Sequence, residues 1–427
     1  MDLKAIARGK LSLEAIPGER RAQVIGGSAA GLAVLVVVLL LVLTTCGGGS
    51  GDAGADQQVG KEASETPSKA VVSIAPKDGA DGVATNDALK VTAAKGKLTK
   101  VEVADSKGEP VKGEIAEDGT SWEPDSHLTT DTKYTVDAVA RDSEGRETTE
   151  RSTFTTLTPK NKFIGHFTPD DGDKVGAGMP VSINFDRAIK DRDAVEEAIS
   201  VTAEPEVDVE GHWFGDQRLD FRPEEYWAAG TKVTLELDLN GVESADGVYG
   251  TQKKSVEFTV GRKQVSVVDA KKKTMTVTRD GKKIKTLPIT SGSPSNPTYN
   301  GKMVISERLK VTRMDGRTVG FGRDEGSGGY DIKDVPHAMR LSTSGTFIHG
   351  NYWTAQSQFG QANLSHGCVG LFDAKGGGDP GTPGAWFFNH SIVGDVVEIK
   401  NSKDETIQPD NGLNGWNMDW DKWTAEQ

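Results

Sequence analysis

Hydrophobic and polar residues alternate in short segments along most of the chain after residue 70. Such alternation places every second side chain on the same face of an extended strand, so it predicts β structure. Turn-forming Gly, Pro and Asp residues separate the segments. We therefore expect a mainly β fold, with one helical turn around residues 193–199.

An internal repeat occupies residues 70–262. Each copy opens on a turn sequence, APKDG at 75–79 and TPDDG at 168–172, and continues in short strand segments. Short strands separated by turns, over about 90–100 residues per copy, are typical of an immunoglobulin-like β-sandwich. We expect two such domains, at 70–158 and 159–262. Neither copy clusters His, Cys and carboxylates, which favours a spacer over a ligand-binding module.

A third, β-rich domain is expected at residues 263–400, where strand segments are joined by Gly- and Pro-rich loops. The segments at 265–269 and 273–278 alternate, and the Asp280-Gly281 pair that follows them is typical of a tight hairpin. The predicted fold class is therefore two immunoglobulin-like sandwiches followed by a further β domain.

A short tail, residues 401–427, follows this domain. It carries Trp416, Trp420 and Trp423 at spacings of four and three, which would place all three rings on one face of a short helix. We expect this helix to dock on the adjacent domain. A platform for stacking sugar rings is the alternative.

The N-terminal part of the chain predicts a membrane anchor. Residues 1–24 are basic, and the uncharged hydrophobic run within residues 25–46 is about as long as the ~20 residues that cross a bilayer. The basic residues before the run favour a cytoplasmic N-terminus, with the rest of the chain on the extracytoplasmic face of the cell membrane. Residues 47–69 are small and polar, and predict a disordered linker.

Two forms of anchor remain open. The run ends in Leu43-Thr44-Thr45-Cys46, which resembles the lipobox of bacterial lipoproteins, so Cys46 is a candidate for lipidation after signal cleavage. The alternative is an uncleaved transmembrane helix.

The charge and cysteine content of the chain exclude some classes of function. Lys and Arg total 50 against 63 Asp and Glu, a formal net charge of −13, which argues against a nucleic-acid partner. The two cysteines, Cys46 and Cys368, lie in very different parts of the chain, so no disulfide is expected. Cys368 is therefore either a buried apolar residue or a reactive thiol. The residues near it in sequence distinguish these two roles.

The neighbours of Cys368 favour a reactive thiol. Two of the 7 histidines, His349 in FIHGNYW and His366 in SHGCVGL, lie close to it in sequence. An imidazole can stabilise a thiolate or remove its proton. Gly367 would let the backbone turn and direct N–H groups at a developing oxyanion. The carbonyl of Gly350 could fix the tautomer of His349.

Other chemistries fit these residues less well. A zinc site built from His349, His366 and Cys368 lacks a fourth ligand. A sortase needs an arginine after its cysteine, whereas the last arginine of the chain is Arg340. Papain-like wall peptidases place cysteine before histidine, the reverse of the order in this chain. His337 and His390 are expected to have structural roles.

The SHGC sequence at 365–368, with an upstream His-Gly pair at 349–350, resembles the signature of the L,D-transpeptidase catalytic domain. The resemblance covers about residues 264–399. The tandem immunoglobulin-like domains and the tryptophan-bearing tail look like those of actinobacterial members. Many members have Asn or Arg two residues after the cysteine, where this chain has Gly370.

The resemblance implies a role for each site residue. Cys368 would be acylated by a peptidoglycan stem tetrapeptide, with His349 as the base oriented by the Gly350 carbonyl. His366 would line the site, and the N–H groups of Gly367 and Cys368 would form the oxyanion hole. Tyr330 would lie in a lid over the site. The further substrate contacts would be Tyr352, Trp353 and Ser365.

The reaction that the resemblance implies is a 3→3 cross-link within the cell wall. The terminal D-Ala of the donor would leave, and the side-chain amine of a diamino acid in another stem would be the acceptor. No metal or cofactor is expected, and carbapenem β-lactams are expected as covalent inhibitors. Two alternatives remain: an L,D-carboxypeptidase with water as acceptor, and a non-enzymatic immunoglobulin-like wall-surface protein.

Overall fold

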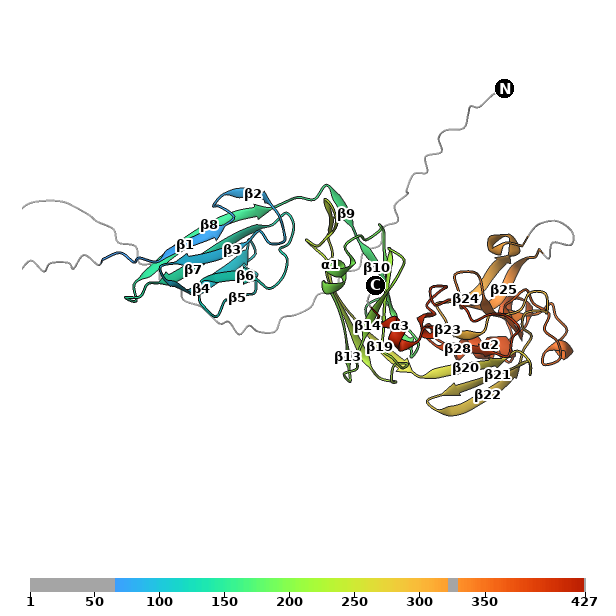
Figure 1. Ribbon diagram of the computed structural model, residues 1–427. Coiled ribbons are helices and arrows are strands. Elements are labelled where there is room, and N and C mark those ends of the chain that lie inside the picture. The colour runs from blue at the N-terminus through green and yellow to red at the C-terminus, as the bar shows by residue number, and fades with distance from the viewer. Residues whose placement is uncertain (1–65, 322–328, 426–427) are drawn as a thin grey trace, which may run out of the picture. The chain divides into compact units, whose positions relative to one another are not determined.

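The computed structural model describes residues 66–321 and 329–425. Strands dominate in each domain, so the mainly β fold that the alternation predicted is confirmed (Figure 1). The predicted anchor, its Cys46 and most of the predicted linker lie outside the described residues. Among the residues that are described, no helix is both long and apolar enough to cross a membrane.

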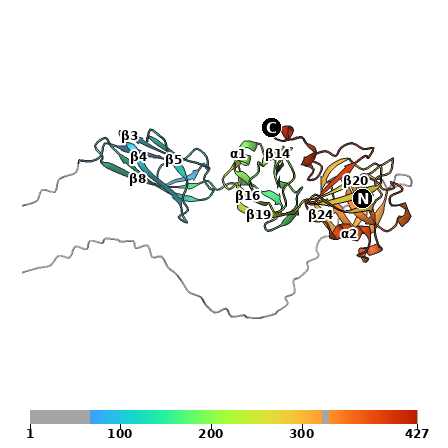
Figure 2. The same ribbon diagram turned by 90° about the horizontal axis from the view of Figure 1, so that it is seen from below.

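The first immunoglobulin-like domain is a sandwich of two four-stranded sheets, ordered β1-β3-β6-β5 and β2-β8-β7-β4. Figure 2 labels strands from both sheets. Its core contains Val91, Trp122, Val136 and Phe154. The strands are β1 (Val71–Ala75), β2 (Ala80–Val83), β3 (Lys90–Ala94), β4 (Lys97–Asp105), β5 (Gly113–Ile115), β6 (Ser121–Pro124), β7 (Lys133–Arg141) and β8 (Glu147–Thr156).

The end of the predicted linker is part of this domain. The hydroxyl of Ser68 donates to the carbonyl of Arg146 at 2.9 Å, and the main-chain N–H of Lys69 donates to Asp142 at 3.0 Å. Ordered structure therefore begins before residue 70, because these polar side chains satisfy backbone groups of the first sandwich.

The second immunoglobulin-like domain has sheets ordered β10-β12-β15-β14, β11-β19-β16-β13 and β17-β18-β9. Its helix α1 (Arg192–Glu197) covers most of the predicted helical turn and begins where the Asp191 side chain accepts the N–H of Ala194. The strands are β9 (Asn161–Phe163), β10 (Gly165–Thr168), β11 (Lys174–Gly176), β12 (Val181–Phe185), β13 (Ile199–Glu204), β14 (Glu210–Phe214), β15 (Arg218–Arg222), β16 (Lys232–Asp238), β17 (Glu243–Ala245), β18 (Val248–Gly250) and β19 (Lys253–Arg262).

The third domain contains two sheets, ordered β22-β21-β20-β28-β23 and β24-β25-β26-β27. One core, which includes Val268, Ile348, Leu371 and Phe387, joins residues of both sheets and of the helix α2. The elements are β20 (Gln264–Asp269), β21 (Thr274–Arg279), β22 (Lys282–Pro288), β23 (Gly301–Val304), β24 (Glu307–Asp315), η1 (Gly316–Val319), β25 (Asp331–Arg340), β26 (Phe347–Asn351), η2 (Gln356–Gln358), β27 (Val369–Phe372), η3 (Lys375–Gly377), α2 (Pro383–Asn389) and β28 (Val396–Lys400).

The tail differs from the single helix that the tryptophan spacing predicted. It forms two separate turns, η4 (Gly415–Asn417) and α3 (Trp420–Trp423). Met418 between them is extended, with φ −100° and ψ 131°, so the helix cannot continue from one turn to the next. The prediction of one helical face is therefore wrong.

The three tail rings nevertheless meet at one place on the second immunoglobulin-like domain. The guanidinium of Arg222 lies 4.9, 5.2 and 4.3 Å from the ring centroids of Trp416, Trp420 and Trp423. The indole N–H of Trp423 donates to the carbonyl of Glu210 at 2.9 Å. The tail is therefore docked on the second immunoglobulin-like domain, through two turns and not through the single helix that was expected.

Candidate active site

Strand pairing brings the predicted base and nucleophile to adjacent strands. His349 lies in β26, whose five residues are all buried, and Cys368 immediately precedes β27. The two strands pair in parallel, with His349 opposite Gly370 and Ile348 opposite Val369. This pairing places His349 and Cys368 on neighbouring segments of one buried part of the sheet.

The ring of His349 is held in one tautomer. Its Nδ1 donates to the Gly350 carbonyl at 2.9 Å, which leaves Nε2 with a free lone pair. Burial lowers the pKa of His349 below its usual value, and the bond to Gly350 opposes this shift. A neutral ring with a free Nε2 can accept a proton.

The thiol of Cys368 is buried and protonated. Its Sγ lies 3.6 Å from the carbonyl oxygen of Gly345, to which the thiol donates. Burial raises the pKa of Cys368 to about 11, and the main-chain N–H of Phe347 opposes that shift. A thiol of this kind needs a base before it can act as a nucleophile.

The turn before Cys368 is held by a serine. Gly367 has φ +118°, a backbone conformation that favours glycine, and its N–H donates to the hydroxyl oxygen of Ser365 at 3.2 Å. The Ser365 hydroxyl in turn donates to the carbonyl of Cys368. Ser365 therefore fixes the backbone that carries the candidate oxyanion donors.

A cavity of about 370 Å³ is lined by His349, Ser365 and Cys368 among other residues. The structure brings Cys368, His349, His366, Tyr330, Trp353 and Ser365 together around it. The complete lining is Met314, Tyr330, Ile332, His349, Asn351, Trp353, Thr354, Leu364, Ser365, His366 and Cys368.

Tyr352 does not line this cavity. Its hydroxyl donates to a carboxylate oxygen of Asp334 at 2.5 Å, and its ring lies edge-on to that of Trp353, with centroids 5.0 Å apart. Tyr352 therefore supports Trp353 from outside the cavity. Trp353 itself stacks over the ring of His349 at 5.6 Å and is 43% exposed.

Aromatic rings surround His366. Its ring centroid lies 5.0 Å from that of Tyr330 and 5.1 Å from that of Phe321. Burial raises the pKa of Tyr330 to about 12, with a smaller contribution from Cys368. The hydroxyl of Tyr330 thus stays protonated and can donate a hydrogen bond into the cavity.

Asn351 is a lining residue that the sequence interpretation missed. It lies two residues after His349 in β26, so both side chains are on the same face of the strand. Its carbonyl oxygen accepts the N–H of Thr354 at 3.0 Å, and its amide donates to the Thr354 hydroxyl at 3.1 Å. The period of two, counted from His349, was the signal that could have identified it.

Close packing against Thr290 explains why position 370 is a glycine. A Cβ atom there would lie 2.8 Å from Cγ2 of the buried Thr290. Thr290 also exchanges main-chain hydrogen bonds with Gly370 at 2.8 and 3.0 Å. A side chain at this position would separate the two segments.

Two further histidines lie outside the cavity. His337 donates from Nδ1 to the fully buried carboxylate of Asp373 at 2.7 Å, and its φ is +51°. His390 stacks on Trp386 at 4.3 Å and contacts the carbonyl of that residue. The described residues contain no group of three or more His, Cys, Asp or Glu arranged to hold a metal ion.

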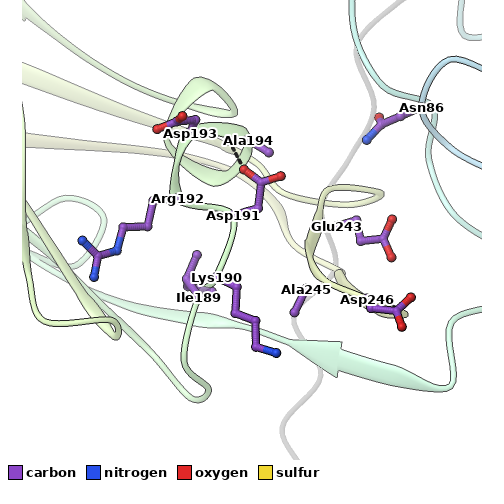
Figure 3. Close-up of a pocket in the computed structure, with 10 residues that line it drawn as sticks. All are labelled: Asn86, Ile189, Lys190, Asp191, Arg192, Asp193, Ala194, Glu243, Ala245 and Asp246. Atoms are coloured by element: carbon purple, nitrogen blue, oxygen red, sulfur yellow. Dashed lines mark hydrogen bonds between the residues drawn. The ribbon is translucent and has the colours of Figure 1, made fainter. Parts of the chain in front are cut away.

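A larger cavity, about 950 Å³, is lined by other residues (Figure 3). All of them except Asn86 belong to the second immunoglobulin-like domain, at 189–194 and at positions 243, 245 and 246. Its carboxylates include Asp191, which caps α1 through the Ala194 N–H drawn in Figure 3. Its lining contains neither histidine nor cysteine, so it lacks the thiol and imidazole of the cavity at Cys368.

Two protein-family models match this chain, one in its immunoglobulin-like domains and one in its third domain. The model of a bacterial Ig domain matches residues 80–243, and that of an L,D-transpeptidase catalytic domain matches residues 263–399.

Individual relatives give the same result. The chain is 34% identical to L,D-transpeptidase 2 of Mycobacterium tuberculosis (strain CDC 1551 / Oshkosh) over 348 residues, which are 82% of each chain. It is 30% identical to L,D-transpeptidase 5 of Mycobacterium tuberculosis (strain ATCC 25618 / H37Rv), over 82% of this chain and 75% of that protein. It is also similar to the solved structure of L,D-transpeptidase 3 from Mycobacterium tuberculosis in complex with a faropenem-derived adduct. That match has 25% identity and a TM-score of 0.44, and covers 55% of this chain and 97% of the other.

Proposed function

Because the chain belongs to the L,D-transpeptidase family, we propose that it forms 3→3 peptidoglycan cross-links through an acyl-enzyme on Cys368. The observation that carries this proposal is a buried thiol and a neutral imidazole on one cavity, with Nδ1 of His349 held by the Gly350 carbonyl. This arrangement supplies a nucleophile and a base in one cavity.

In the acylation half-reaction, Nε2 of His349 takes the proton of the Cys368 thiol. The sulfur attacks the carbonyl carbon at the L-centre of the third residue of a stem tetrapeptide. A C–S bond forms, and the C–N bond to the terminal D-Ala breaks. His349 returns its proton to the departing amine, so the base is neutral again.

The oxyanion that forms during this step needs donors. The N–H groups of Gly367 and Cys368 are directed by the same turn, which Ser365 holds through the Gly367 N–H and the Cys368 carbonyl. For Gly367 to donate to the oxyanion, its 3.2 Å bond to Ser365 must be exchanged for the stronger charge-assisted bond.

In the second half-reaction, the side-chain amine of another stem's third residue attacks the thioester. His349 accepts a proton from the amine, an amide bond forms, and the C–S bond breaks. His349 then returns that proton to the sulfur, which regenerates the thiol and the neutral base. Tyr330, His366 and Trp353 line the cavity in which the stem peptides would lie, and Tyr352 supports Trp353 from outside it. No step in this sequence calls for a metal or cofactor.

Product analysis tests the proposal directly. The chain from residue 47 onward, incubated with a disaccharide-tetrapeptide, is expected to release D-Ala and to form a 3→3 cross-linked dimer, detected by mass spectrometry. The Cys368→Ala variant should form neither. Tripeptide monomer without dimer would show that water is the acceptor and would identify an L,D-carboxypeptidase. No change in the tetrapeptide with the unmodified chain would favour a non-enzymatic wall protein.

We also propose that the enzyme is held at the outer face of the cell membrane, within the wall, by its N-terminal segment. The uncharged run within residues 25–46 and the Leu43-Thr44-Thr45-Cys46 sequence support a lipid anchor on Cys46. The hydrophobic run itself, uncleaved, is the second form that such an anchor would take.

Metabolic labelling with a fatty-acid analogue distinguishes the two forms of anchor. The full-length chain is expected to take up label, and the Cys46→Ala variant is expected to lose it completely, because the thiol is the attachment point. The Cys368→Ala variant serves as the matched control and should keep the label. Label that persists in Cys46→Ala would contradict lipidation at this residue.

A further inference from the structure

The hairpin loop between β25 and β26 lies against the nucleophile. It runs from Leu341 to Thr346, and the N–H of Leu341 donates to the carbonyl of Thr346 at 2.8 Å to close it. The carbonyl of Gly345 in this loop is the group to which the Cys368 thiol donates. Phe347, directly after the loop, supplies the N–H that acts on the same sulfur.

Asn411 of the tail makes three hydrogen bonds to this loop. Oδ1 of Asn411 accepts the main-chain N–H of Ser344 at 3.0 Å and the hydroxyl of Thr343 at 2.8 Å. Nδ2 of Asn411 donates to the Ser344 hydroxyl at 2.8 Å. All three bonds therefore end on the two loop residues that directly precede Gly345.

A second tail asparagine fixes the start of the loop. Asn414 is fully buried, and its Nδ2 donates to the carbonyl of Leu341 at 2.9 Å. Between the two asparagines, Gly412 has φ +94°, and a Cβ there would lie 3.1 Å from the Leu341 carbonyl oxygen. The tail thus approaches the loop closely at a position that only glycine accommodates without strain.

The second immunoglobulin-like domain binds the tail on both sides of Asn411. The guanidinium of Arg218 donates to the carbonyl of Asp410 at 2.9 Å and to that of Gly412 at 2.7 Å, the residues on either side of Asn411. Arg218 is itself held by the buried Asp220, with Nε to Oδ1 at 2.9 Å. Its guanidinium therefore cannot move away without breaking an ion pair.

We propose that Asn411 is a positioning residue for the nucleophile, acting through the 341–346 loop, and that Arg218 supports it from the neighbouring domain. The inference rests on the proposed function, since the step that it serves is acylation of Cys368. Thr343 and Ser344 are exposed, so without Asn411 their polar groups would bond to water and the loop would sample other conformations. The Gly345 carbonyl would then no longer hold the sulfur in one rotamer.

The test compares three full-length variants in their acylation by imipenem. The extent of acylation is measured on the peptide that contains Cys368. In Asn411→Ala the maximal rate constant is expected to fall about tenfold, because a small displacement of a reacting group is costly, while the half-saturating concentration stays within about twofold. Asn411→Asp keeps the acceptor for Ser344 and Thr343 and should stay within about threefold of the unmodified chain. Arg218→Ala should slow the reaction in the same direction as Asn411→Ala.

The matched control is another tail asparagine, Asn417. Its side chain exchanges bonds of 2.8 and 2.7 Å with the main chain of Lys302 in β23, away from the loop. Asn417→Ala is expected to leave the rate constant within about twofold. An equal loss in Asn417→Ala and Asn411→Ala would assign the effect to general loosening of the tail and overturn the proposal. A smaller amplitude of modification with unchanged rate constants would do the same.

Alkylation of Cys368 by iodoacetamide provides a reading that does not depend on the proposed function. Since the sulfur is buried and bonds to the loop at Gly345, Asn411→Ala should raise its alkylation rate at least about threefold while it slows acylation. An unmodified chain that forms no imipenem adduct would contradict the proposed function, and the alkylation rates would still test the loop. Equal alkylation rates in the unmodified and Asn411→Ala chains would contradict the positioning role.

Discussion

The His349→Gln variant is expected to acylate Cys368 about 10²–10⁴ times more slowly than the unmodified chain, the usual contribution of a positioned general base. Burial raises the pKa of Cys368 to about 11, so only on the order of 10⁻⁴ of the thiol is ionised at neutral pH. The reaction therefore depends on Nε2 of His349, and a glutamine amide cannot accept the proton. Stopped-flow measurement of β-lactam acylation gives the rate.

The matched variant is His366→Gln. His366 lines the same cavity, but it is exposed and its ring packs against Tyr330 and Phe321. We expect a smaller loss of rate, together with weaker binding of the β-lactam. Equal losses of rate at both histidines would contradict the assignment of His349 as the base.

Much of the fold could be predicted from the sequence, because buried strands follow a simple period. The segment at 181–185 alternates in the sequence and is β12 in the structure, and the Asp280-Gly281 pair forms the β21–β22 turn, with both residues at positive φ. These features depend on neighbours in sequence, which a local pattern captures.

The tail shows where local patterns fail. Spacings of four and three predicted one helix, but Trp416 and Trp423 donate to the carbonyls of Gly178 and Glu210, far away in the chain. The tail forms two short turns, and each carries one of these donating rings. Tertiary contacts overrode the local preference.

The site could be predicted where one short segment supplies its chemistry. The bond from His349 to the adjacent Gly350 carbonyl was expected from two neighbouring residues. The contact between Cys368 and Gly345 was not, because it joins residues 23 positions apart. Asn411 lies 67 positions from Ser344, and no local pattern indicates that pairing.

The sequence suggested that the second immunoglobulin-like domain is only a spacer. In the structure this domain also contacts the C-terminal tail. Arg218 and Arg222 both contact the tail, through the carbonyls of Gly412 and Met418. The domain therefore fixes the tail, and the tail fixes a loop at the active site. A spacer alone would not need these hydrogen bonds to the tail.

Covalent labelling by a carbapenem is the second large effect expected. Opening of the strained β-lactam ring requires the Cys368 sulfur, a base and oxyanion donors, the same groups proposed for the stem peptide. The ring carbonyl takes the place of the peptide carbonyl, and the lactam nitrogen remains tethered to the acyl group as the leaving group. The drug therefore stays on the enzyme and adds its whole mass.

The role of Cys368 as the nucleophile is tested most directly by the intact mass of the chain from residue 47 onward after incubation with a carbapenem. This form contains one cysteine, Cys368, so the site of addition is unambiguous. We expect a gain of one drug mass in the unmodified chain and no gain in Cys368→Ala, each unaffected by a metal chelator. An adduct that persists in Cys368→Ala, or an unmodified chain that gains no mass, would contradict the assignment of Cys368 as the nucleophile.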